Sequence, residues 1–128
     1  MIYGILGLGS IGSRHAANLI KLGQKVIAFD PSAQQVERAR NLGMPVTSSR
    51  EEVLDKSQAV VICSPNQFHL QDLKDSIAAT CHTFVEKPLS HTALGVDILL
   101  DEATAKGLQI FAGLNLRFHP AVRAAKNL

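Results

Sequence analysis

The sequence has little of what marks several classes of protein. It has only two cysteines, Cys63 and Cys81, without metal-ligand spacing, so we expect two reduced side chains in a cytoplasmic protein and no metal site. Its 13 basic and 11 acidic residues are scattered and leave a net charge of +2, which argues against a nucleic-acid or membrane surface. The N-terminal stretch MIYGILGLGSIG has no positively charged residues at its start and reaches glycines after only a few apolar residues. It therefore predicts neither a signal peptide nor a membrane span.

What remains is the composition of a compact α/β domain. The 128 residues are 46% apolar and 19% charged, which suits a chain folded around one core. Short β-branched runs alternate with stretches of helical periodicity, and this pattern predicts a Rossmann-type doubly wound parallel sheet of about six strands. The expected strands are residues 2–6, 25–30, 45–48, 58–64, 82–86 and 108–113. The last expected helix, residues 92–107, has Leu94, Ile98, Leu99 and Ala103 on its predicted inner face.

The first strand is followed by the glycine pattern G-x-G-x-x-G. Gly7 suits a tight turn, Gly9 lets the backbone approach a pyrophosphate, and Gly12 lets the next helix pack close to the strand. With Ser10 and Ile11, these glycines form a predicted phosphate-binding loop at a helix N-terminus. The alternative is a set of ordinary turn glycines, which the strand–turn–helix context disfavours.

Asp30 ends the second strand and lies 18 residues beyond Gly12. A carboxylate there is placed to accept hydrogen bonds from both hydroxyls of an adenosine ribose, although it could also be a solvated side chain. It would repel a 2′-phosphate, and Pro31 and Ser32 supply no arginine to bind one. The nearby cation Arg14 is better described as a solvated helix residue. NAD is therefore the expected cofactor, and NADP is less favoured.

The fourth expected strand leaves through the sequence CSPNQFH. Ser64, Pro65 and Asn66 follow the strand directly, and His69 lies one turn into the next helix. In open parallel sheets ligands bind beyond the carboxyl ends of the strands, so this exit belongs to the expected site. By its local sequence, His69 could equally be a half-buried surface histidine.

The fifth expected strand ends on Glu86, Lys87 and Pro88. Charged groups beside an apolar core need partners, which a bound cofactor and substrate could supply. A solvated Glu–Lys pair on a loop is the alternative.

Together these motifs resemble one family of enzymes. G-x-G-x-x-G, a strand-ending Asp, SPNxxH, EKPL and NLRFHPAV occur in the same order, at similar spacings, in the glucose–fructose oxidoreductase and inositol dehydrogenase family. The resemblance covers residues 2–122. It implies that Lys87 lies between nicotinamide and substrate and assists proton transfer, as the catalytic candidate, and that Glu86 supports the nicotinamide ribose.

The resemblance extends to further site residues and to the domain organisation. It implies that Ser64, Asn66 and His69 line the cofactor cleft, and that Asn115 and Arg117 lie near its end. Residues 1–118 would form the dinucleotide-binding domain, and residues 119–128 would begin a connecting helix. Family members continue into a C-terminal sheet domain that completes the substrate pocket, and this domain is expected to be absent from the present chain.

The expected function is that of the NAD-binding domain of an oxidoreductase. The resemblance implies hydride transfer to or from a sugar, polyol or sugar derivative, with an oligomer for the full-length enzyme and activity only as part of it. Two alternatives remain open at the level of sequence: a non-catalytic dinucleotide-binding module, and a reductase domain of the biliverdin-reductase kind. Fold alone does not choose among them.

Overall fold

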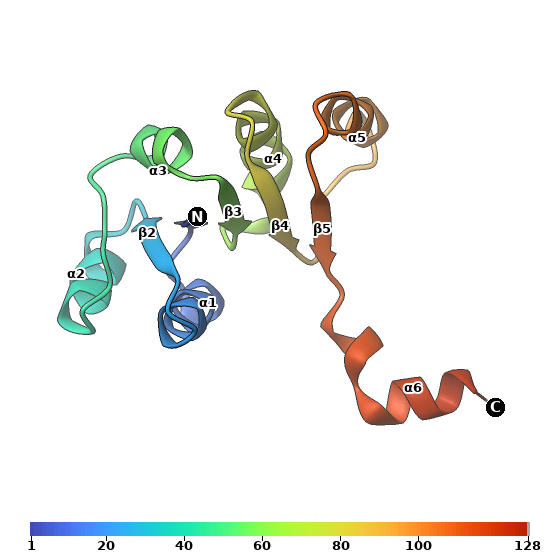
Figure 1. Cartoon of the computed structure of the whole chain (residues 1–128), viewed down its shortest axis with the longest axis horizontal. Helices are drawn as coiled ribbons and strands as arrows, with labels where there is room; N and C mark the ends of the chain where they lie inside the picture. Colours follow the sequence, from blue (N-terminus) through green and yellow to red (C-terminus); the bar gives the residue numbers. More distant parts are fainter. Residues whose placement is uncertain (128) are drawn as a thin grey trace.

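A computed structural model describes residues 1–127, so Leu128, the last residue of the expected connecting helix, lies outside the described residues. Its centre is a parallel sheet with the strand order β2-β1-β3-β4-β5 (Figure 1). The strands are β1 (Ile2–Leu6), β2 (Lys25–Phe29), β3 (Ala59–Ile62), β4 (His82–Glu86) and β5 (Ile110–Gly113). The order reverses beside β1, where β2 lies on one side and β3 on the other. An α/β sheet of this kind binds ligands at such a switch point.

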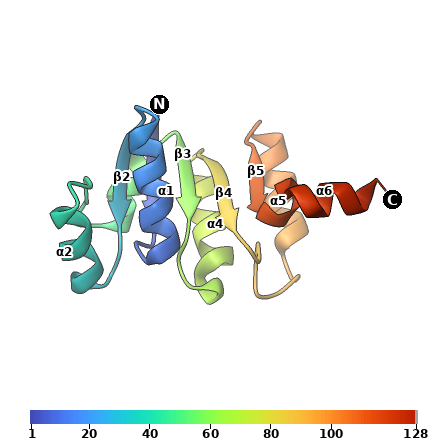
Figure 2. The ribbon, with the colours of Figure 1, turned by 90° about the horizontal axis from the view of Figure 1, so that it is seen from below.

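Helices cover both faces of the sheet, as Figures 1 and 2 show. One face carries α1 (Ser10–Lys21) and α2 (Ala33–Asn41), and the other carries α3 (Arg50–Lys56), α4 (His69–Ala78) and α5 (Val96–Ala105). Each face has its own apolar core. Ile5, Ala16 and Val26 are buried on the first, whereas Leu6, Leu73 and Ile77 are buried on the second. Neighbouring β1 residues thus point to opposite faces, which explains why the strand reads as a continuous apolar run.

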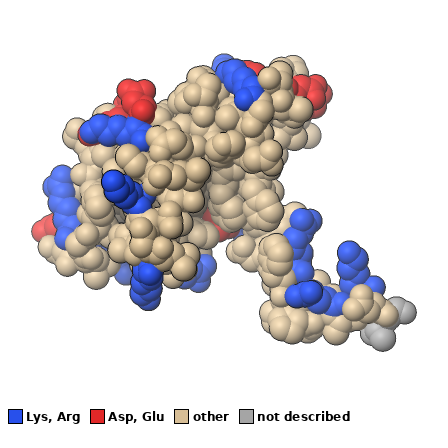
Figure 3. Space-filling view, in the orientation of Figure 1, with Lys and Arg blue, Asp and Glu red and all other residues tan. Residues whose placement is uncertain are grey.

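The C-terminal segment leaves this layered body. After β5 come a short helix, η2 (Asn115–Phe118), and α6 (Pro120–Lys126), which extend away from the sheet in Figure 1. On the face that Figure 3 shows, Lys and Arg side chains are spread over the body and this segment. None of the helices in residues 1–127 combines the length and apolarity needed to cross a membrane.

Two details of the expected fold are wrong. Residues 45–48 form no strand, so the sheet has five strands instead of about six. Only Val46 pairs with Ala28, in an isolated parallel bridge. The segment is short, and Pro45 has no N–H to donate, although its carbonyl accepts from the Ala28 N–H at 3.0 Å.

The helix expected from residue 92 begins only at Val96, after Gly95 with φ at 80°. Leu94 and Ile98, expected inside, are 84% and 68% exposed, whereas Leu99 and Ala103 are buried as expected. The later start explains why Leu94 is exposed: this residue precedes the helix and does not lie on its inner face.

Candidate functional site

A cleft of about 600 Å³ opens where β1, β2 and β3 end. The carboxyl ends of parallel strands share one edge of the sheet, so residues distant in sequence meet there. Five of the predicted site residues line this cleft: Gly7, Gly9, Asp30, Ser64 and Pro65. Its other walls include five polar or charged side chains that the sequence did not predict: Gln35, Arg50, Gln71, Asp72 and Asp75.

The three glycines of the turn differ in how much space surrounds them. Gly7 has φ at 94°, and an added Cβ would lie 2.6 Å from the Cys63 carbonyl oxygen. At Gly12 an added Cβ would collide with the Gly7 carbonyl oxygen. At Gly9, by contrast, an added Cβ would meet no atom within 4 Å. The fold therefore needs Gly7 and Gly12, whereas Gly9 leaves open space in front of the turn.

That open space faces the N-terminus of α1. Gly9 is the N-cap, no side chain caps the helix, and its first turn contains no acidic residue. The free N–H groups and the positive end of the helix dipole favour an anion at this position. Ser10 and Ile11 begin the helix and are exposed. A phosphate group fits this turn both in space and in charge.

Asp30 supports the turn and the following loop with its carboxylate. Its Oδ2 accepts from the Leu8 N–H at 2.6 Å, and its Oδ1 accepts from the Ser32 N–H at 2.8 Å. Each carboxylate oxygen has further lone-pair capacity, so both can also accept from ribose hydroxyls in the cleft.

Gln35 contributes an unsatisfied acceptor to the same wall. Its Oε1 is buried and has no hydrogen-bond partner in the part of the chain that the structure describes. Buried polar atoms are nearly always paired, so an unpaired oxygen in the wall of a cleft points to a donor supplied by a ligand. The adenine amino group of a dinucleotide is such a donor.

Arg50 links α3 to α4 at the floor of the cleft. Its Nε and Nη2 donate to Asp72 Oδ1 at 2.9 and 2.7 Å, and Nη2 also donates to Asp75 Oδ2 at 2.7 Å. Burial works against its charge, but hydrogen bonding and attraction from the two carboxylates outweigh burial and raise the pKa of the guanidinium. Sequence reasoning missed this group because its partners lie 22 and 25 residues away and follow no motif.

His69 lies beneath the cleft instead of in its wall. The residue is 1% exposed, with Nδ1 2.6 Å from the Pro88 carbonyl oxygen and Nε2 2.8 Å from the Ser64 carbonyl oxygen. Carbonyl oxygens only accept, so both contacts are hydrogen bonds at once only when both ring nitrogens carry protons. The ring thus joins the exit of β3 to the exit of β4. Asn66, in the short helix η1 (Asn66–Phe68), is exposed and does not line the cleft.

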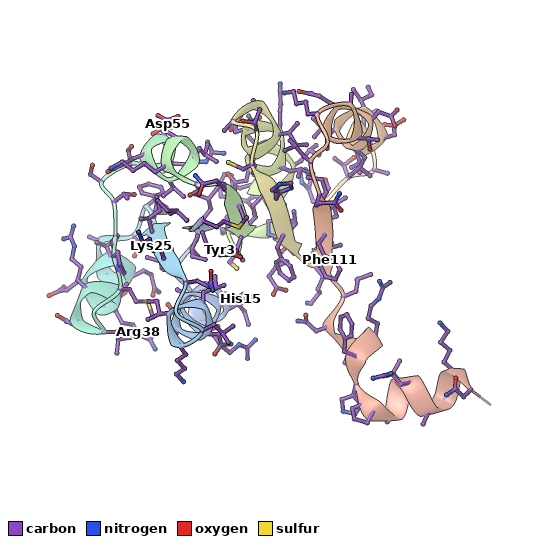
Figure 4. All side chains as sticks on the ribbon, in the orientation of Figure 1. Tyr3, His15, Lys25, Arg38, Asp55 and Phe111 are labelled. Atoms are coloured by element: carbon purple, nitrogen blue, oxygen red, sulfur yellow. The ribbon has the colours of Figure 1, made fainter. Side chains whose placement is uncertain are left out.

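Glu86 has a partner that the sequence analysis did not anticipate. Its Oε1 lies 2.8 Å from Nε2 of His15, and the two side chains are 13% and 28% exposed. His15 comes from α1 on the side that faces the sheet (Figure 4), and its ring centroid is 5.3 Å from that of Phe84. Burial, together with the charge of Glu86, also raises the pKa of the Cys63 thiol to about 12.

Lys87 is exposed and forms no hydrogen bond or ion pair with residues 1–127. The peptide bond between Lys87 and Pro88 is cis. Asn115 and Arg117 lie in η2, are exposed, and do not line the cleft. Within residues 1–127, no cluster of three or more metal-ligating side chains occurs.

The five-stranded parallel sheet, the glycine turn and the strand-ending Asp define a dinucleotide-binding α/β domain. A family described as "Oxidoreductase family, NAD-binding Rossmann fold" matches residues 1–114, and the chain belongs to this family.

Individual relatives agree with this assignment. The chain is 30% identical to the myo-inositol 2-dehydrogenase of Thermotoga maritima, over 92% of this chain and 37% of the relative. It is 28% identical to a D-xylose 1-dehydrogenase (NADP(+)) of Haloferax volcanii, over 100% of this chain and 41% of the relative. The scyllo-inositol dehydrogenase of Lactobacillus casei, solved with NAD(H) and scyllo-inositol, superposes with a TM-score of 0.86 at 27% identity. That match covers 100% of this chain and 40% of the solved one.

Proposed function

We propose that this chain is the NAD-binding part of an oxidoreductase that transfers hydride between NAD(H) and a carbon of a sugar, polyol or sugar derivative. The observation that carries the proposal is the open space at Gly9, before an uncapped helix N-terminus and in the same cleft as Asp30. The chain spans about two fifths of the length of the relatives described above. Activity, substrate and oligomeric state are therefore proposed for a longer protein.

Two parts of the dinucleotide have proposed positions in the cleft. The turn from Gly7 to Gly12, with the N–H groups of Ser10 and Ile11, would hold the pyrophosphate. Asp30 would bind the adenosine ribose, and Ser64 and Pro65 would form the opposite wall. Bound NAD supplies the hydride acceptor, so the protein has to provide only position, charge and a route for the proton.

The end of β4 supplies the proposed acid–base group. Lys87 is exposed and unpaired within the described chain, so its side chain is free to contact a substrate hydroxyl. In its neutral amine form it would take the hydroxyl proton and become an ammonium group. Glu86 is held by His15 at 2.8 Å and would face the nicotinamide ribose. Asn66, His69, Asn115 and Arg117 are outside the cleft wall, and for them we propose a supporting role only. The compartment we propose is the cytoplasm, because Cys63 and Cys81 are both free.

The cofactor assignment has a direct test. We expect NADH to bind at least about tenfold more tightly than NADPH, a difference of about 1.4 kcal/mol. The reason is that Asp30 would accept from the ribose hydroxyls, whereas a 2′-phosphate would meet its negative charge. Titration calorimetry or cofactor fluorescence with the unsubstituted chain measures both affinities. Equal affinities would refute the preference, and no binding of either cofactor would refute the proposed function.

A further inference from the structure

The charge of the cleft extends beyond Asp30. Among the described residues that line it, Arg50 is the only cation, and Asp30, Asp72 and Asp75 are the anions. Three carboxylates against one guanidinium leave a net charge of −2 in the cleft. An added phosphate monoester would bring up to two more negative charges into the same space.

Among the described lining residues, this single cation is held by two carboxylates, which take three of its five N–H donors. Arg50 makes three hydrogen bonds to two carboxylates, all between 2.7 and 2.9 Å. Asp72 is buried and also accepts from the Ser64 hydroxyl, so its position is fixed from two sides. Asp75 is half-buried and accepts from Gln71 Nε2 at 2.9 Å through its other oxygen. Arginine is well suited to bind phosphate through its fork of N–H donors, but here carboxylates occupy the Nε and Nη2 side of that fork.

We propose that Asp72 and Asp75 are specificity-determining residues: by neutralising Arg50, they deny the 2′-phosphate of NADP the one cation in the cleft. The inference rests on the proposed function and adds a second barrier to the repulsion by Asp30. Removing Asp30 alone is then insufficient to admit NADP. Removing the charge of Asp75, the more exposed partner, leaves Arg50 with one carboxylate instead of two and frees an Nη2 N–H donor for the phosphate.

The experiment starts from Asp30→Asn, which removes the first barrier. NADPH affinity is compared among this variant, Asp30→Asn/Asp75→Asn, and the triple variant that also carries Arg50→Gln. The matched control is Asp30→Asn/Asp55→Asn. Asp55 is exposed on the outer side of α3, so its substitution makes the same charge change away from the cleft (Figure 4). NADH affinity and a urea-unfolding curve are recorded for each protein.

Asp75→Asn should tighten NADPH binding at least about tenfold in the Asp30→Asn background, because it removes one negative charge and frees one of the guanidinium N–H donors. Adding Arg50→Gln should abolish this gain, and Asp55→Asn should change the affinity by less than about twofold. A purely structural ion pair would change the unfolding curve without changing the ratio of NADPH to NADH affinity. If Asp75→Asn is unfolded, Asp75→Ala makes the same charge change with a better helix former.

Three results overturn the inference while leaving the proposed function intact. The first is an unchanged NADPH affinity in Asp30→Asn/Asp75→Asn when this variant still binds NADH. The second is a gain in NADPH affinity that persists after Arg50→Gln is added. The third is an equal gain in NADPH affinity from Asp55→Asn. Failure of the unsubstituted chain to bind NADH would overturn the proposed function and this inference with it.

Discussion

At the phosphate turn, some glycines are required by the fold and one is explained only by a ligand. Gly7 and Gly12 face backbone atoms that leave no room for a side chain, whereas Gly9 faces open space. Glycine at position 9 has no steric explanation within the described chain, and a closely approaching phosphate supplies one. The turn therefore offers a comparison between two glycines three residues apart.

Gly9→Val should abolish NADH binding at a cost of about 1 kcal/mol in unfolding free energy, since valine is only a poorer N-cap. Gly12→Ala is the control, because its methyl group would collide with the Gly7 carbonyl oxygen. We expect it to cost about 1–3 kcal/mol or more. NADH fluorescence titration and urea denaturation measure the two effects. A folded Gly9→Val variant that binds NADH normally would show that the pyrophosphate does not lie at this turn.

Cys63 lines the cleft but should be chemically inert. Burial and the charge of Glu86 raise its thiol pKa from 9.0 to about 12. The thiol therefore stays protonated at pH 8, and its thiolate fraction is about a thousandfold lower than that of an unperturbed cysteine. Alkylation by iodoacetamide at pH 8 should be slower by a similar factor in the folded protein than in urea, and should accelerate as the pH is raised. Mass spectrometry follows the reaction, and rapid modification of folded protein at pH 8 would contradict the assignment.

At the scale of elements, the exits of β3 and β4 are held together by one buried ring. His69 begins α4, yet its two nitrogens contact the carbonyl oxygens of Ser64 and Pro88, which follow different strands. Pro88 directly follows Lys87, so the ring also fixes the turn that carries the proposed acid–base group. The contact converts two independent loops into one edge of the site.

His69→Ala should lower the unfolding free energy by about 2–4 kcal/mol, because it leaves a cavity and removes the ring contacts with two carbonyl oxygens. His91→Ala is the matched control. His91 is exposed, so its loss should change stability by no more than about 0.5 kcal/mol. Urea denaturation compares the two. Equal effects of the two substitutions would mean that the His69 contacts contribute nothing measurable.

The elements that could be predicted from the sequence are those with a strong local signal. β1, β3 and β4 are apolar runs bounded by turns, and the glycine turn and Asp30 follow a spacing that the phosphates and ribose require. Residues 45–48 do not form the expected strand. The segment is so short that it pairs with β2 through a single bridge, between Val46 and Ala28.

The site contacts that the sequence did not predict join residues on elements far apart in the chain. The Arg50 contacts join α3 to α4, and the His15–Glu86 pair spans 71 residues. Neither follows a local pattern. Local sequence left His69 undecided between a cleft residue and a surface one, and only the packing of α4 under both loops shows that it is buried.

For the whole molecule, the structure presents the cofactor cleft and the exposed Lys87 on the same edge of one sheet. The relatives described above are about two and a half times as long as this chain, so other parts of such enzymes lie outside the region compared. We expect residues 1–128 alone to bind NADH without oxidising inositols or sugars. Turnover of any polyol by the isolated chain, measured as NADH formation, would overturn this division of the site.

Substitution of Lys87 tests whether the segment that follows β4 takes part in the reaction. In the longer enzyme proposed here, Lys87→Ala should reduce kcat by about 10²–10⁴-fold, the usual contribution of a positioned acid–base group. NADH affinity should change little, because the glycine turn and Asp30 line the cleft at the ends of β1 and β2, whereas Lys87 follows β4 and does not line it. Lys87→Arg should restore little activity, because a guanidinium keeps its charge but does not release a proton near neutral pH. Steady-state kinetics and NADH titration separate these effects. If the Lys87→Ala enzyme keeps full turnover, the EKPL sequence is a structural turn, and the proton must leave the substrate through another group.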